Sequence, residues 1–247
     1  MVKPFYKAII LVLASDNNPL YKEFRKIYQE YLDIDPEIKV FLVYGNQFSV
    51  EKQSYDLVYD DIPENYYPGM ILKTIRALED IDNNFDYDFL VRTNLSTFWD
   101  IPKLKERLDR QPKKNCLTGS LRRCRYKNKT SPDYIGGINL VLSRDLVKKL
   151  IDYKDEVSSW DLPEDWAISQ MFINLGLMPR QCLPKPMHLM EHHTEYNEKL
   201  LLREIELAKS KKCDNYRIKS KTSDRLTVDI GIAKLLLKEI YNKVVVN

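Results

Sequence analysis

Two basic side chains recur at alternating positions near the C-terminus. Arg217 and Lys219 lie two residues apart in the segment 216–221. In an extended chain, residues at this spacing point to the same side. Arg can bind a diphosphate through two parallel hydrogen bonds, and Lys adds a compact positive charge. The spacing predicts a phosphate-binding pair, and solvated surface charge is the alternative interpretation.

All three histidines of the chain fall close together. His188 and His192 are four residues apart and His193 follows directly, a spacing that would let the first two bind a metal from one face of a helix. Pro184 and Pro186 precede them, however, and favour an extended chain. No carboxylate partner is evident from the spacing. We therefore interpret His188 and His193 as phosphate contacts rather than as metal ligands.

Two adjacent carboxylates stand where a helix is predicted to begin. Glu164 and Asp165 follow Leu162-Pro163, and proline is frequent at the first position of a helix. Acidic residues in a first turn are stabilised by the helix dipole. A carboxylate in this position could also accept a proton from a substrate hydroxyl. The residues alone favour the helix-dipole interpretation.

The elements that must position these side chains alternate along the N-terminal half. The run 8–14 is continuously apolar, as expected for a strand covered on both faces. The predicted order is strand 8–14, helix 20–31, strands 39–44 and 56–59, helix 70–78 and strand 89–91. This order predicts an α/β fold with an open, mixed, mostly parallel Rossmann-like sheet flanked by helices. Ligands are then expected at the carboxyl ends of its strands, where Ser15 and Asp16 lie.

The second half is predicted to add shorter strands and several helices. Strands are expected at 115–120 and 137–143, with Ser143 capping a helix that runs to 153. Further helices are expected from 164 to 175, near 198–211 and near 228–241. The chain contains neither an internal repeat nor a low-complexity linker. We predict a single domain over residues 1–247.

The bulk composition excludes several classes of protein. With 247 residues, of which 44% are hydrophobic, the chain can bury a full core. Its 39 basic and 36 acidic residues are too balanced to predict nucleic-acid binding. No apolar run reaches the length of a membrane span, and no signal peptide is evident. The four cysteines lack zinc-site spacing. A cytoplasmic protein with reduced thiols is expected.

Three segments, in order, resemble one family of enzymes. Residues 60–74 are similar to an acidic, Tyr-containing turn that leads into a helix with Leu-Lys-Thr in its first turn. Residues 87–98 align with a strand that reads Lys-Thr-Asp-Asp-Asp in that family. Residues 133–166 resemble its Tyr-x-x-Gly strand, its Val-Leu-Ser helix start and its Glu-Asp-Val motif. The family is that of the β-1,3-galactosyltransferases and Fringe-like glycosyltransferases. The match spans roughly half the chain, as expected for a divergent branch of viral or bacterial type.

The resemblance implies a GT-A fold and a reaction. A hexose or deoxyhexose would pass, with inversion, from a UDP-, GDP- or dTDP-sugar to a glycan or another hydroxyl acceptor. Asp165 matches the catalytic carboxylate of the family and would be the general base, with Glu164 as the second candidate. Residues 1–115 would form the nucleotide-sugar-binding half, and residues 116–247 the acceptor-binding and catalytic half.

The chain departs from the family at the metal-binding acidic triplet. The equivalent positions read Asn94-Leu95-Ser96, whereas a hard divalent cation prefers anionic oxygens. We therefore predict a reaction that needs no metal cofactor, and weakly held Mn²⁺ or Mg²⁺ is the alternative. Asn94 and Ser96 would contact ribose or phosphate. The diphosphate would be neutralised by a set of cations: Lys73, Arg92, Arg217 and Lys219, with one of the histidines.

Further contacts are predicted from residue type and position. Tyr66, Trp160 and Trp166 could form walls on which an acceptor sugar stacks. Gly136 and Gly137 would permit close approach of the backbone to a ligand, or form an ordinary tight turn. Asp60 would contact the base or the ribose of the donor, as would Ser15 and Asp16.

Two other functions deserve comparison. A pseudoenzyme that binds a nucleotide sugar or a carbohydrate without turnover is compatible with the altered triplet, although the retained Glu164 and Asp165 argue against it. A nucleotidyltransferase usually has a Gly-rich phosphate loop after the first strand, and residues 15–20 contain no glycine. The second of these functions is therefore disfavoured.

Overall fold

The first strand, β1 (Phe5–Leu13), is buried on both faces and lies near the centre of the main sheet. Ala8 and Val12 pack into one hydrophobic core, whereas Ile9 and Leu11 pack into another on the opposite face. This alternation follows from the two-residue period of a strand. The computed structural model, which describes residues 2–189 and 195–245, thus confirms the prediction of a strand covered on both faces.

Seven strands form the main sheet. Every neighbouring pair is parallel except the two pairs made by β11, which runs antiparallel to both of its neighbours. The prediction of a mixed, mostly parallel sheet is confirmed. In spatial order the strands are β12 (Arg180–Gln181), β6 (Leu117–Gly119), β11 (Leu140–Ser143), β4 (Asp86–Asn94), β1, β2 (Ile38–Tyr44) and β3 (Asp56–Val58).

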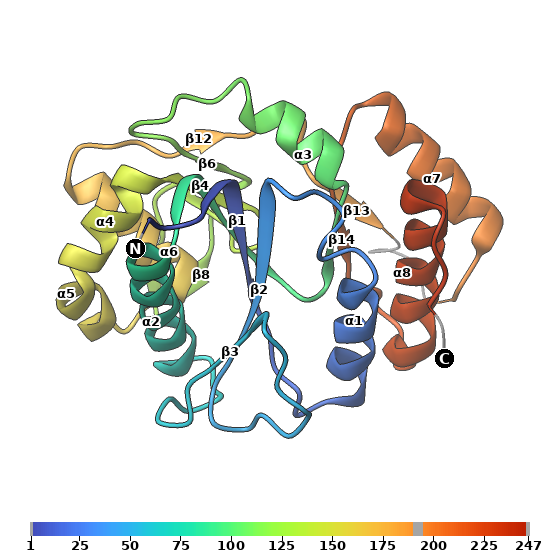
Figure 1. The fold of residues 1–247 in the computed structure, drawn as a ribbon, viewed down its shortest axis with the longest axis horizontal. Coiled ribbons are helices and arrows are strands. Elements are labelled where there is room, and N and C mark those ends of the chain that lie inside the picture. Colours follow the sequence, from blue (N-terminus) through green and yellow to red (C-terminus); the bar gives the residue numbers. More distant parts are fainter. Residues whose placement is uncertain (1, 190–194, 246–247) are drawn as a thin grey trace.

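Helices cover both faces of this sheet (Figure 1). The buried hydrophobic residues of α1 (Pro19–Gln29), α3 (Ile101–Leu108), α7 (Glu198–Ser210) and α8 (Arg225–Tyr241) belong to the first core. The second core contains buried residues of α2 (Gly69–Asn84), α4 (Arg144–Asp152), α5 (Lys154–Ser159) and α6 (Glu164–Asn174). Among the described residues no helix is both long and apolar enough to cross a membrane.

A second, three-stranded sheet brings the C-terminal part of the chain to the end of β4. It contains β13 (Met187–Leu189), β14 (Asn215–Ile218) and β5 (Thr97–Trp99). β14 pairs antiparallel with β5, so that Arg217 lies opposite Thr97. Two short ladders complete the fold: β7 (Leu121–Arg122) with β10 (Tyr134–Ile135), and β8 (Arg125–Tyr126) with β9 (Lys129–Thr130).

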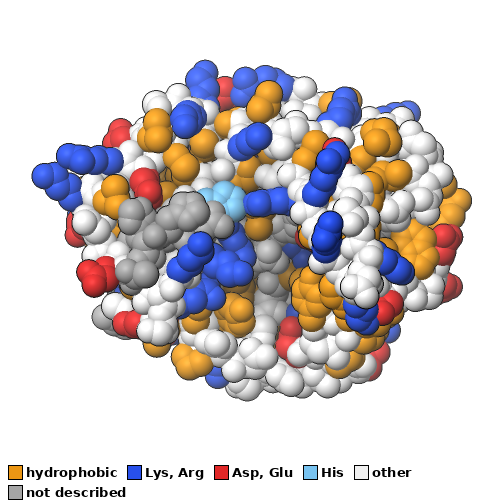
Figure 2. All heavy atoms as spheres, turned by 180° about the vertical axis from the view of Figure 1, so that it is seen from behind, with side chains coloured by type: hydrophobic (Ala, Val, Ile, Leu, Met, Phe, Trp, Pro, Cys, Tyr) orange, Lys and Arg blue, Asp and Glu red, His pale blue; other side chains and the backbone are white. Residues whose placement is uncertain are grey.

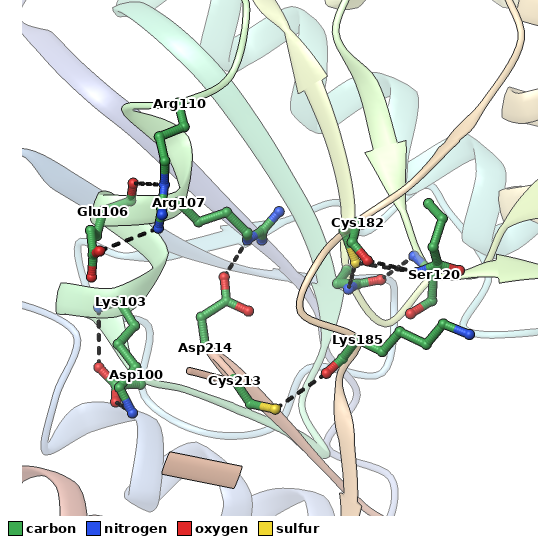
Figure 3. A network of polar contacts seen from close by, with 12 residues as sticks. Asp100, Lys103, Glu106, Arg107, Arg110, Ser120, Cys182, Lys185, Cys213 and Asp214 are labelled. Atoms are coloured by element: carbon green, nitrogen blue, oxygen red, sulfur yellow. Dashed lines mark hydrogen bonds and ion pairs between the residues drawn. The ribbon is translucent and has the colours of Figure 1, made fainter. Parts of the chain in front are cut away.

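A buried polar network anchors the start of β14 (Figure 3). The Nε atom of Arg107 on α3 donates to Asp214 Oδ2 at 2.5 Å, and both side chains are almost fully buried. The backbone carbonyl of Asp214 accepts from the Asp100 amide at 2.8 Å. Cys213 Sγ contacts the Lys185 carbonyl oxygen at 3.4 Å, which ties in the segment that leads to β13. These contacts fix the strand that carries Arg217.

Two local predictions need correction. Ser143 precedes α4 in the N-cap position, but its hydroxyl donates to the Asp145 carboxylate and accepts from the Cys116 amide, so it caps no helix amide. The strand expected from residue 137 begins only at Leu140. The chain first makes a turn in which the Ile138 amide donates to the Gly136 carbonyl oxygen at 2.8 Å.

Candidate active site

A cavity of about 320 Å³ opens where β4 ends, and it gathers side chains from both halves of the chain. Figure 2, which views the molecule from the side opposite to Figure 1, shows Lys and Arg side chains gathered around the one histidine coloured pale blue. The placement agrees with the rule that open α/β sheets bind ligands at the carboxyl ends of their strands. The lining residues are Tyr66, Met70, Arg92, Asn94, Arg122, Tyr134, Gly136, Gly137, Ile138, Glu164, Asp165, His188, Arg217 and Lys219.

A buried ion pair forms one wall of the cavity. Arg92 contacts Glu164 through two parallel interactions, Nη2 to Oε2 at 2.6 Å and Nε to Oε1 at 3.0 Å. The Thr74 hydroxyl donates to Glu164 Oε1 at 3.0 Å. Burial raises the pKa of Glu164, and the charge of Arg92 acts in the opposite direction. Because its carboxylate is enclosed by these partners, Glu164 fits the role of holding Arg92 better than that of a base meeting a substrate hydroxyl.

Asp165 has a different environment although it is the next residue. It is half-buried at the start of α6 and lines the cavity. Its Oδ2 accepts from the Gly137 amide at 2.7 Å, and its Oδ1 accepts from the Trp166 amide at 3.0 Å. The helix dipole also favours a negative charge at this position. The carboxylate is therefore oriented by two amides while it faces the cavity.

Another part of the cavity lining is basic. Arg217 donates from Nη1 to Ser96 Oγ at 2.5 Å. Burial lowers the pKa of its guanidinium to about 10, and the positive charges of Arg225 and Arg92 contribute to the shift. Within the described chain no carboxylate forms a salt bridge with Arg217. A partly buried cation in this situation favours binding of an anion.

Further basic groups extend this wall. His188 on β13 lies opposite Arg217 on β14, and Lys219 follows two residues later. Arg122 Nη2 lies 3.0 Å from His188 Nε2. The predicted placement of Arg217 and Lys219 on one side of the chain agrees with their position in the cavity. His193, the other histidine predicted to contact phosphate, lies outside the described residues, as does His192.

The segment Asn94-Leu95-Ser96 does not present a good cation site. Asn94 Oδ1 accepts from Arg92 Nη1 at 3.1 Å, so the amide oxygen faces a guanidinium. Leu95 is buried, and the hydroxyl of Ser96 is engaged by Arg217. Over residues 2–189 and 195–245, no group of three or more His, Cys, Asp or Glu side chains is arranged to hold a metal ion. The donor set at 94–96 therefore fits Mn²⁺ or Mg²⁺ poorly.

Several residues predicted to bind the donor lie outside the lining of this cavity. Asp16 Oδ2 accepts from the backbone amide of Ser49 at 2.6 Å and from its hydroxyl at 3.0 Å. Lys73 is buried, donates to the Ala14 carbonyl oxygen at 2.8 Å and pairs with Glu64. These contacts order the loops beside β1. Three further predicted donor contacts do not line the cavity: Ser96 is buried, Ser15 is half-buried and Asp60 is exposed.

The predicted acceptor residues divide in the same way. Tyr66 lines the cavity and is 56% exposed, and Gly136 and Gly137 also line it. Trp160 instead packs against the second core, and Trp166 is buried. Neither Trp lines the cavity, so neither forms the predicted stacking wall.

Gly137 illustrates why a glycine is needed at this site. A Cβ atom there would lie 2.0 Å from Arg92 Nη1, and the Gly137 carbonyl oxygen accepts a hydrogen bond from the same guanidinium. The close approach is to the side chain of Arg92. The prediction that a glycine here permits close approach is met, but the group that approaches the backbone is the Arg92 guanidinium and not a ligand.

Four lining residues were missed as site residues: Met70, Arg122, Tyr134 and Ile138. Tyr134 stands in the Tyr-x-x-Gly segment, so the motif itself contained a signal. Its ring stacks on Trp166, with centroids 6.3 Å apart. Tyr134, and not Trp166, is therefore the aromatic side chain that lines the cavity. Arg122 had no such signal, because only its pairing through β7 and β10 brings it beside the cavity.

Comparison with known proteins identifies no family. No family model and no curated protein matches the sequence. Among solved structures, a glycosyltransferase involved in glycosylating the major capsid of PBCV-1 aligns with a TM-score of 0.47 and 10% identity, over 89% of this chain and 98% of that one. The apo form of the glycosyltransferase GlyE of Streptococcus pneumoniae aligns with a TM-score of 0.49 and 10% identity, over 96% of this chain. The alignment spans 62% of the GlyE chain.

Proposed function

We propose that this chain is a GT-A-like glycosyltransferase that transfers a sugar from a nucleoside diphosphate to a hydroxyl acceptor. One observation carries the proposal: Asp165 and a set of basic side chains line the same cavity, at the strand ends where α/β sheets bind ligands. The sequence resemblance supports the same reaction, because its candidate base is the carboxylate that faces the cavity.

The charge of the cavity suits a diphosphate leaving group. Arg92 and Glu164 neutralise each other, which leaves Arg122, Arg217 and Lys219 against the single carboxylate of Asp165. Positive groups fixed in advance stabilise the negative charge that develops on the leaving diphosphate. Arg217 would be the main contact, because it is held by Ser96 and has no carboxylate partner among the described residues.

The proposed reaction is a direct displacement. The acceptor oxygen attacks the anomeric carbon while Asp165 removes the proton of that hydroxyl, and the bond from the anomeric carbon to the diphosphate oxygen breaks. Attack and departure on opposite faces of the sugar would invert the anomeric configuration. The Gly137 and Trp166 amides orient the carboxylate, and the cavity places the two substrates in line.

We propose that the diphosphate is neutralised by side chains without a divalent cation. The support is chemical: the oxygen of Asn94 faces Arg92, and that of Ser96 faces Arg217. A dication placed there would be repelled by two guanidinium groups. In this proposal Asn94 and Ser96 position the guanidinium groups, and Arg217 supplies the positive charge.

The test is turnover in the presence of EDTA. UDP-, GDP- and dTDP-sugars would be incubated with the protein, and release of the nucleoside diphosphate measured with and without a mixture of glycan acceptors. We expect one donor class to turn over in EDTA and the Asp165→Asn variant to lose that turnover. Donor binding with no turnover in any condition would support the pseudoenzyme. Turnover that appears only with Mn²⁺ or Mg²⁺ would overturn the metal-free proposal.

A further inference from the structure

A strongly basic hairpin borders the cavity on the side of Asp165. Residues 121–130 contain five Lys or Arg and no Asp or Glu, although the whole chain has 39 basic and 36 acidic residues. The segment leaves the cavity through β7, turns through β8 and β9, and returns as β10, which carries Tyr134. Positive charge is therefore concentrated beside the candidate base.

The start of the hairpin is tied to the cavity. Arg122 lines the cavity, and the Cys124 amide donates to the Ser131 hydroxyl at 2.9 Å across the hairpin. Tyr126 lies farther along the chain, on β8. Arg123 pairs with Asp133 at 2.5 Å.

Tyr66 connects the candidate base with the start of the hairpin, because it lines the cavity together with Asp165 and Arg122. Burial raises the pKa of Tyr66 to about 12, with contributions from Asp165, Glu164 and Tyr126. Because it is also 56% exposed, it offers a ring at the cavity mouth on which a sugar can stack.

The hairpin register adds a cation to this aromatic surface. Tyr126 lies directly opposite Lys129 in the antiparallel ladder, so the two side chains share one face. Lys127 in the turn lies 5.5 Å from the Tyr126 ring centroid and pairs with Asp161 at 2.5 Å, which holds the hairpin against the segment before α6. Arg125 and Lys129 are both exposed, and neither forms a salt bridge within the described chain.

We propose that the acceptor is an anionic saccharide whose carboxylate or phosphate group is bound by this hairpin. The inference rests on the proposed function, because Asp165 defines where the acceptor hydroxyl must lie. A sugar ring would stack on Tyr66 and Tyr126, and its anionic substituent would bind Lys129, with Arg125 adding to the local positive field. The hairpin would thus select acceptors by charge.

The experiment compares matched saccharides. Fluorescein-labelled oligogalacturonate and its neutral methyl ester test the carboxylate. A phosphorylated oligomannoside and its dephosphorylated form test the phosphate. Binding is measured by fluorescence anisotropy at low ionic strength, where exposed charges interact most strongly. The double variant Arg125→Gln/Lys129→Gln is compared with Lys148→Gln/Lys149→Gln, which removes the same charge from exposed positions on α4.

We expect at least one anionic oligosaccharide to bind about tenfold more tightly than its neutral partner. The hairpin variant should lose about five- to tenfold in affinity for it, and the α4 variant should lose little. Equal binding of charged and neutral forms, or an equal loss in both variants, would overturn the proposal. A single-stranded oligonucleotide that outcompetes both saccharides would overturn it in favour of a nucleic-acid surface.

A separate measurement distinguishes failure of this inference from failure of the proposed function. Hydrolysis of the sugar donor in the absence of acceptor depends on the basic wall that contains Arg122 and Arg217, and not on Arg125 or Lys129. We expect the α4 variant, whose substitutions lie outside the cavity lining, to hydrolyse donor at the wild-type rate. Donor hydrolysis without any preference for anionic saccharides would reject the acceptor inference alone. Absence of donor hydrolysis in the wild type would reject the enzymatic proposal on which it rests.

Discussion

Replacing each of the two adjacent carboxylates should have opposite effects on stability and turnover. Glu164→Gln leaves the Arg92 guanidinium buried, with only 2% of its side chain exposed, beside a neutral amide. Removing one partner of a buried ion pair costs about 3–5 kcal/mol. For a chain of this size each kcal/mol lowers Tm by about 2–4 °C. We therefore expect Tm to fall by about 6–20 °C.

Asp165→Asn should behave in the reverse manner. The amide oxygen of Asn can still accept a hydrogen bond from Gly137, and Asp165 is only half-buried, so we expect a loss of about 1 kcal/mol or less. Loss of the proton acceptor, however, should reduce turnover by about 10²- to 10⁴-fold. Glu156→Gln, at an exposed position on α5, serves as the control for removal of one carboxylate.

Both quantities are measurable on the same samples. Circular dichroism gives Tm, and release of nucleoside diphosphate is followed at a temperature where every variant is folded. The opposite result is a stable Glu164→Gln variant that has lost turnover, together with an Asp165→Asn variant that retains it. That pattern would transfer the role of base to Glu164.

Three further outcomes follow from the site. Arg217→Met should weaken binding of a nucleoside diphosphate by about 10- to 100-fold in calorimetry, because a hydrogen bond to a charged group contributes about 1.5–3 kcal/mol. The Tm of the free protein should not fall. Ser96→Ala removes the hydroxyl that holds Arg217 and should weaken nucleoside diphosphate binding by less than tenfold. A loss as large as that of Arg217→Met, or larger, would contradict the assignment of Arg217 as the main contact. Gly137→Ala places a Cβ 2.0 Å from Arg92 Nη1 and should cost about 1–3 kcal/mol in denaturant unfolding. Gly136→Ala should cost less, because its nearest neighbour is a carbon of the exposed Arg122 side chain; equal losses would contradict the packing argument.

The main sheet could be predicted because its information is local. The apolar run that became β1 needs no partner to be recognised, and the spacing of Arg217 and Lys219 indicates a shared face wherever the strand is placed. Family-like motifs identified Asp165 as the candidate base. In each case a few neighbouring residues contain the pattern.

The rest of the site depends on contacts between distant residues. Arg92 and Glu164 are 72 positions apart, and nothing in either local sequence shows that they pair. Lys73 lies in the first turns of a helix and was predicted to contact the diphosphate, but its ammonium group pairs with Glu64 and donates to the Ala14 carbonyl oxygen. Residue type alone also could not show that Trp166 would lie behind Tyr134.

The most direct test of the central claim is calorimetric titration of EDTA-treated protein with UDP, GDP and dTDP, repeated in the presence of Mn²⁺. We expect one of the three nucleotides to bind without metal, Mn²⁺ to change its Kd by no more than about twofold, and Arg217→Met to abolish most of the affinity. Tightening by more than about tenfold on addition of Mn²⁺ would contradict this expectation, because the cation would then supply the charge here assigned to Arg217 and its neighbours.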